Sequence, residues 1–259
     1  MPPSTPRPID VFEENLADAE VLLKFADGLQ TQRTRKLRVE RRDKVGRALG
    51  MTKDERAEID GAESDHLFVL LKAGSPFTRE DFTEVALSPL LRQAVVAVSA
   101  AIETWVADRA AEFAGEALKA RHDRLSRVPL DLGTVLDIES RYQRRSWGYR
   151  DVLISHVQAM ASPSPGQIGQ VFALVGRPIK WGVIDNSRRV DKGQSESALT
   201  EIYARRNQIA HSADRGGRSR RTIAADEVRG YVDSARSIVE AIERHLAMDD
   251  APLNNVSPA

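Results

Sequence analysis

Residues 89–119 read PLLRQAVVAVSAAIETWVADRAAEFAGEALK, the longest apolar stretch with helical spacing in the chain. Its large side chains recur with the 3.6-residue period of an α-helix. This stripe contains Val95, Val98, Ile102, Trp105, Val106 and Phe113. A second face carries the small residues Ser99, Ala100, Ala107 and Ala110, with Glu103 among them. The stretch predicts a long core helix whose small face lets a neighbouring backbone approach, and where one carboxylate is tolerated if a cation meets it.

Helical spacing dominates the rest of the chain, and no segment shows sustained two-residue alternation. Helices are expected near residues 9–29, 31–48, 52–72, 166–175, 196–213 and 224–247, with two helical pieces within 129–160 around Trp147-Gly148. The segment from Trp181 to Ser195 is polar and is expected to be irregular. The fold class expected is therefore all-α, a helical bundle with an additional N-terminal helical segment.

The chain is expected to divide into three parts. Residues 1–75 form an Arg-rich accessory segment, 76–248 a helical domain, and 249–259 a disordered tail. The accessory segment has three open interpretations: a separate unit, an arm over a cleft, or a dimerisation element. Its basic stretch at 31–47 either binds RNA phosphates or is a solvated helix face, and the second reading is the commoner one.

Composition excludes several kinds of chemistry. The chain has 259 residues and no cysteine, which excludes disulfides, iron–sulfur clusters and thiol catalysis. Its histidines show no metal-ligand spacing and no phosphate-binding loop is present, so neither a metal nor a cofactor is expected. The N-terminus lacks the layout of a signal peptide, and no apolar run approaches a membrane span, so the protein is expected to be cytoplasmic.

The hexapeptide Arg206-Asn207-Gln208-Ile209-Ala210-His211 combines a permanent cation with the one side chain that titrates near neutral pH. A guanidinium binds phosphate oxygens and an imidazole moves a proton, so the pair suits phosphodiester cleavage without a metal. On a regular helix, positions five apart differ by about 140°, so convergence requires the helix to loosen near His211. From spacing alone, a solvated helix cap with no chemistry is the commoner explanation.

The segment from Leu199 to His211 resembles the signature helix of the HEPN superfamily, most closely its RiboL-PSP type. That signature is an arginine, usually followed by a polar residue, and then a histidine. The helix from Ala94 to Ala120 resembles the first core helix of the family, and residues 228–246 resemble its closing helix. The resemblance covers roughly residues 85–247.

The resemblance implies a helical bundle that dimerises, with both signature helices facing each other across one cleft. It also implies metal-independent endoribonuclease activity. Arg206 and His211 carry over as the catalytic pair, Asn207 as the polar residue that orients them, and Glu103 as the carboxylate that holds Arg206. Arg205 also fits the permitted spacing, which makes the assignment ambiguous, and Arg206 is preferred because Asn207 follows it.

The expected reaction is attack of a 2′-hydroxyl on the adjacent phosphorus, which leaves a 2′,3′-cyclic phosphate and a 5′-hydroxyl. RNA is the expected partner, bound by the basic side chains Arg205, Arg215, Arg218, Arg220 and Arg221. A toxin or antiviral-defence role, a homodimer and an antitoxin or defence-system partner are expected. A subgroup of the family has a tyrosine two residues after the histidine, where this chain has Ala213, so regulation through that tyrosine is not expected. Two alternatives remain: a non-catalytic module that binds RNA or protein, and a scaffold.

Overall fold

The computed structural model describes residues 6–30, 79–120, 123–212, 214–216 and 219–249, with a few isolated positions between 44 and 76. Within these ranges the protein is helical apart from one short hairpin, which confirms the all-α class. Apart from those isolated positions, the helices predicted at 31–48 and 52–72 lie outside the described residues, as do the tail beyond Asp249, Ala213 and Arg218.

In chain order, the described elements begin with a long N-terminal helix and end with a long C-terminal one. They are α1 (Pro8–Gln30), the 3-10 helix η1 (Arg79–Phe82), α4 (Glu84–Lys119), the 3-10 helix η2 (Asp123–Arg127), α5 (Leu132–Arg141), α6 (Arg145–Met160), α7 (Pro165–Leu174), α8 (Trp181–Arg188), α9 (Gln194–Ser212), β1 (Arg215–Gly216), β2 (Ser219–Arg220) and α10 (Ala225–Asp249). Strands β1 and β2 pair antiparallel, with Arg215 opposite Arg220.

Helix α4 begins five residues before the proline at which the sequence predicted its start. Thr83 caps it, because the Thr83 hydroxyl accepts a hydrogen bond from the backbone N–H of Ala86. Pro89 has no N–H and would leave the carbonyl of Val85 without its helical partner. The hydroxyl of Ser88 donates to that carbonyl at 2.6 Å. The helix therefore continues through the proline.

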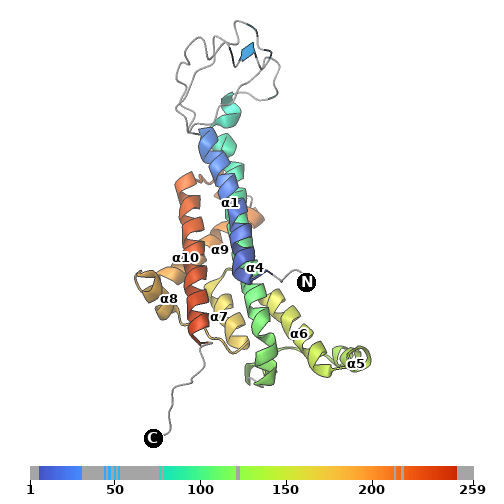
Figure 1. Cartoon of the computed structure of the whole chain (residues 1–259). Helices are drawn as coiled ribbons and strands as arrows, with labels where there is room; N and C mark the ends of the chain where they lie inside the picture. The colour runs from blue at the N-terminus through green and yellow to red at the C-terminus, as the bar shows by residue number, and fades with distance from the viewer. Residues whose placement is uncertain are drawn as a thin grey trace.

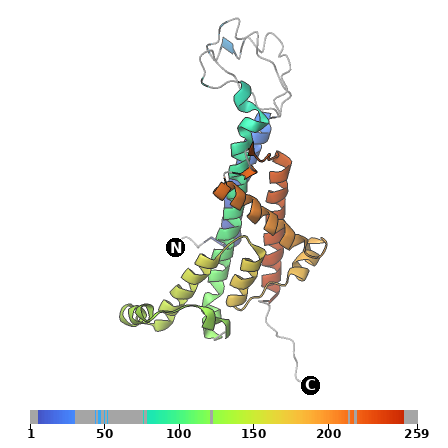
Figure 2. The ribbon, with the colours of Figure 1, turned by 180° about the vertical axis from the view of Figure 1, so that it is seen from behind.

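Helices α1, α4 and α10 form the centre of the molecule, with α1 and α4 side by side along much of their length (Figures 1 and 2). All six large residues of the stripe predicted on α4 are buried. The α1 residues Phe12, Leu16, Ala19, Leu23 and Ala26 are buried in the same cluster. Arg236 on α10 pairs with Glu13 at 3.1 Å and Glu20 at 2.9 Å. The first helix of the predicted accessory segment thus shares the core of the predicted helical domain.

Two predictions within the smaller helices were wrong. The segment predicted to be irregular contains α8, which ends where Arg189 adopts a left-handed conformation with φ of 58°. The break predicted around Trp147-Gly148 instead falls between Arg141 and Arg145. Gly148 lies inside α6, where a Cβ atom would stand 2.7 Å from Cγ2 of Ile138. Gly148 therefore allows α5 to approach α6 closely and does not break the helix.

Among the described residues, the stretch Glu80–Lys119, which covers most of η1 and all of α4, is long and apolar enough by length and composition to cross a membrane, contrary to the expectation from the sequence. Half of its most apolar window is buried inside the protein, against neighbouring helices. A core helix passes the same test, so this feature is weak evidence for a membrane span.

Candidate functional site

The start of α9 is fixed by a buried carboxylate on α8. Asp185 is 2% exposed and accepts hydrogen bonds from the backbone N–H groups of Gly193 at 2.7 Å and Ser195 at 3.0 Å. Burial opposes ionisation of Asp185, but the hydrogen bonds from Ser195 and Gly193 outweigh it and lower the pKa of Asp185. A negative charge next to the N-terminal turn of α9 also suits the helix dipole.

The end of α9 is fixed by a second buried carboxylate, Asp214. Its Oδ2 accepts a hydrogen bond from Nε of Arg92 on α4 at 2.7 Å. Its Oδ1 accepts one from Nη1 of Arg205 on α9 at 2.5 Å. Asp214 is fully buried and has φ of 59°, a conformation that aspartate tolerates better than most residues. Asp214 therefore joins α4, α9 and the hairpin at one point, and we call Arg92, Asp214 and Arg205 the arginine clamp.

All three nitrogens of the Arg205 guanidinium have partners within the protein. Besides Asp214, its Nη2 donates to the carbonyl of Thr222 at 2.9 Å, and its Nε lies 3.1 Å from the Glu227 carboxylate. The residue is only 7% exposed. This burial does not fit the RNA-binding role predicted for Arg205, because a bound phosphate needs an accessible guanidinium. Arg205 is better assigned to holding the end of α9.

Arg206, the next residue, has different surroundings. It is half-buried, and its Nη1 donates to Oδ1 of Asn207 at 3.1 Å. Among the described residues no carboxylate pairs with Arg206. Of the two candidate arginines, Arg206 therefore has the guanidinium that remains available to an anion.

His211 is exposed near the C-terminal end of α9, one turn after Asn207 and on the same face. The helix does not loosen at His211 as convergence with Arg206 would require, because α9 continues to Ser212, whose hydroxyl donates to the carbonyl of Gln208. Arg206 and His211 therefore leave the helix about 140° apart. The hydrogen bond to Asn207 draws the Arg206 head group towards the face that carries His211.

Glu103 is half-buried on α4. Within the described ranges, no hydrogen bond or ion pair joins Glu103 to Arg206, the contact that the resemblance implies. The structure joins Arg206 to the adjacent Asn207 and places Asn207 and His211 on one face of α9, and within the described ranges it does not join Glu103 to them.

The hairpin after α9 and the residue that follows it present three exposed cations. Arg215 and Arg220 stand directly opposite each other across its two strands. Like charges in that arrangement repel, and a bound anion would relieve the repulsion. Arg221 is also exposed and its Nη1 donates to Oε1 of Gln208 at 2.9 Å. Strand β1 packs against α9, so these cations gather near its C-terminal end.

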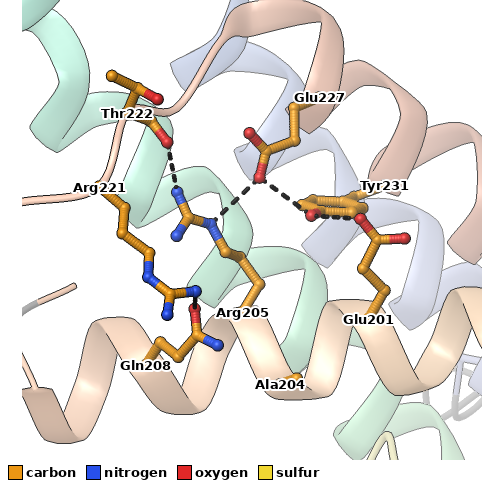
Figure 3. A pocket seen from close by; sticks show the side chains of 8 residues that line it. All are labelled: Glu201, Ala204, Arg205, Gln208, Arg221, Thr222, Glu227 and Tyr231. Carbon is orange, nitrogen blue, oxygen red and sulfur yellow. Dashed lines mark hydrogen bonds and ion pairs between the residues drawn. The ribbon is translucent and has the colours of Figure 1, made fainter. Parts of the chain in front are cut away.

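A groove of about 470 Å³ runs between α9 and the start of α10 (Figure 3). Tyr231 lies at one end, with its phenol oxygen 3.0 Å from Glu201 and 3.0 Å from Glu227. Burial and the adjacent Glu227 carboxylate raise the pKa of the Tyr231 phenol, so it stays protonated at neutral pH. Tyr231 therefore acts as a hydrogen-bond donor and not as a base.

The sequence did not single out Arg92, Asp214, Glu201 or Glu227, and it placed Tyr231 only within the helix expected near residues 224–247. Arg92 and Asp214 are 122 residues apart, so no local spacing points to their contact. Within the described ranges, no group of three or more His, Asp or Glu side chains gathers as metal ligands.

No protein-family model, no curated protein and no solved structure matches this chain. The HEPN resemblance accordingly stays a prediction that depends on the signature residues of α9 and the order of the three helices.

Proposed function

We propose that the protein is a metal-independent endoribonuclease in which two copies of α9 face each other across one cleft. The observation that carries this proposal is the pairing of Arg206 with Asn207, one turn before the exposed His211. A cation without a carboxylate partner and an accessible imidazole are the two groups that a phosphodiester cleavage by the 2′-hydroxyl needs. Arg215, Arg220 and Arg221 supply nearby positive charge for flanking phosphates.

In the proposed mechanism His211 relays the proton of the 2′-hydroxyl as this oxygen attacks the neighbouring phosphorus. Arg206 stabilises the charge that develops on the phosphoryl oxygens. The bond to the 5′-oxygen breaks, and the products are a 2′,3′-cyclic phosphate and a 5′-hydroxyl. Asn207 holds the guanidinium in place through its side-chain carbonyl.

A second copy is part of the proposal because one chain leaves this face open. His211 is exposed, and the groove found between α9 and α10 includes neither Arg206 nor His211. Catalysis gains from excluding water around the reacting phosphate. A second α9 packed across the first would enclose both faces and would double the positive charge.

The test is cleavage of a single-stranded RNA by purified protein in the presence of EDTA. His211→Ala should lower the rate about 10²–10⁴-fold, the usual contribution of a general acid or base. Arg206→Gln should lower it about 10²–10³-fold. His156→Ala and Arg244→Gln serve as matched controls, because His156 lies on α6 and Arg244 is exposed on α10.

Loss of cleavage on chelation would refute the mechanism, and so would undiminished cleavage by His211→Ala. The cut ends give an independent check, since they should carry a 2′,3′-cyclic phosphate. Toxicity on overexpression that His211→Ala relieves would fit the toxin or defence role.

One observation favours a second candidate, a non-catalytic module that binds RNA. In the described part of the chain no side chain hydrogen-bonds to the exposed His211 ring, whereas catalytic imidazoles are usually oriented by a partner. A binding module predicts that His211→Ala keeps the affinity for RNA and that the wild-type protein cuts nothing.

A further inference from the structure

The groove beside α9 has opposite charges at its two ends (Figure 3). Its lining residues are Glu201, Ala204, Arg205, Gln208, Arg221, Thr222, Glu227 and Tyr231. Its volume of about 470 Å³ falls in the range of small-ligand sites, ~300–1,000 Å³. Unlike most such sites it is open and polar, which suits part of a polymer better than a fully enclosed small molecule.

Glu201 and Arg221 are the two charged residues of this groove that have no oppositely charged partner among the described residues. Glu201 is exposed and, among the described residues, only the Tyr231 hydroxyl bonds to it. The Arg221 guanidinium bonds only to the side-chain carbonyl of Gln208 in the same ranges. The charge of Glu227 is instead met by Arg205. The groove therefore offers a carboxylate acceptor at one end and a cation at the other.

The groove leads along α9 to His211. Glu201 and Gln208 are seven residues apart on the helix, so the two ends are separated by about 10 Å. Ala204 lines the groove and lies seven residues before His211, which places both on the same face of α9. The cationic end with Gln208 and Arg221 is the end nearer to His211, because Gln208 lies three residues before His211 on α9 and Glu201 lies ten residues before it.

We propose that this groove binds a guanine nucleotide of the RNA next to the scissile phosphate, with the base edge at Glu201 and a phosphate at Arg221. This inference rests on the proposed endoribonuclease. Guanine presents two adjacent N–H donors, N1 and N2, which a carboxylate accepts with both oxygens. Adenine and cytosine present an acceptor next to their donor, and uracil has a single donor between two acceptors. A carboxylate therefore repels the acceptor atoms on the edges of adenine, cytosine and uracil.

The first experiment compares short RNAs that differ only by one guanine or adenine in an otherwise uniform sequence. The wild-type protein should cut the guanine substrate with a kcat/KM about 10-fold or more above the adenine substrate, as expected for one well-formed bidentate contact. Glu201→Gln should reduce this ratio to within about 3-fold. Asp233→Asn, an exposed carboxylate on α10 away from the groove, should keep the ratio. A guanine preference that survives Glu201→Gln would overturn the proposal.

The second experiment measures binding without cleavage, by calorimetry with guanosine 3′-monophosphate and adenosine 3′-monophosphate on His211→Ala protein. Tighter binding of the guanine nucleotide, lost in the double variant with Glu201→Gln, supports the groove even if the wild-type protein proves unable to cut RNA. RNA cleavage together with equal binding of the two nucleotides overturns the guanine site and leaves the nuclease standing. If the wild-type protein cuts no RNA and the two nucleotides bind equally, both the guanine site and the nuclease are overturned.

Discussion

Asp214→Asn is the substitution that most sharply tests how α9 is held. Asparagine keeps the size and shape of aspartate and also tolerates the left-handed conformation of this position. It removes the one negative charge that lies between Arg92 and Arg205. The side chains of these arginines are only 10% and 8% exposed, so water cannot compensate for the lost charge.

The magnitude follows from the burial of the clamp. Breaking a buried ion pair by removing one partner costs about 3–5 kcal/mol, because the remaining charge stays buried without a counter-charge. For a chain of this size that corresponds to a fall in Tm of ~6–20 °C. Glu227 remains 3.1 Å from Arg205 and offsets part of the lost charge on that side. The loss of the Asp214 charge therefore affects Arg92 more than Arg205.

The assay is urea unfolding followed by far-UV circular dichroism, with Asp226→Asn as the matched control. Asp226 also pairs with an arginine, Arg229, but its side chain is 91% exposed and the pair is screened by water. Asp214→Asn should lower the midpoint strongly while Asp226→Asn leaves it nearly unchanged. A loss below about 1 kcal/mol for Asp214→Asn would refute the clamp as the element that fixes the end of α9.

Three further predictions concern the packing and the other end of α9. Leu16→Ala should cost about 2–5 kcal/mol in urea unfolding, because Leu16 is fully buried in the common core; a cost below ~1 kcal/mol would mean that α1 is a detachable arm. Gly148→Ala should lower the free energy of unfolding, because the added Cβ atom collides with Ile138. Gly182→Ala has open space around it and should raise the free energy of unfolding by about 0.4–1 kcal/mol. A stabilising effect of both substitutions would contradict the close packing of α5 on α6. The pKa of Asp185 is lowered in the folded state, so its ionised carboxylate stabilises the fold above pH ~4, and this contribution is lost as the pH falls through the folded pKa. The difference in free energy of unfolding between the wild type and Asp185→Asn should therefore shrink below pH ~4 in acid titrations; a constant difference would contradict this.

The helices with clear periodicity were predictable from the sequence. The large apolar residues predicted to line α4 recur every 3.6 residues, and all six are buried. Helix α8 was missed because it is short and polar, and its burial of Ile184 and Asp185 follows from packing that no local pattern records. The start of α4 was misplaced because the proline suggested a boundary, while a serine hydroxyl replaces the missing backbone donor.

The candidate site was predictable in its residue types and not in its contacts. The sequence named Arg206, Asn207 and His211, and it preferred Arg206 to Arg205 only because Asn207 follows Arg206. The contacts that distinguish the two arginines come from Asp214 and Arg92, which reach Arg205 and each other only through the folded chain. The groove depends in the same way on carboxylates from two helices, Glu201 and Glu227, that meet at one tyrosine.

The most direct test of the central claim is subunit mixing. Arg206→Gln and His211→Ala chains, carried on different affinity tags, are co-expressed, and the heterodimer that binds both tags is assayed on RNA with EDTA. If the two α9 helices share one cleft, the heterodimer contains one intact Arg206 and one intact His211 in that cleft, and it should regain cleavage that neither parent homodimer shows. A heterodimer as inactive as its parents, beside a wild-type protein that cuts RNA, would contradict the shared cleft, and a wild-type protein that leaves RNA intact would contradict the nuclease itself.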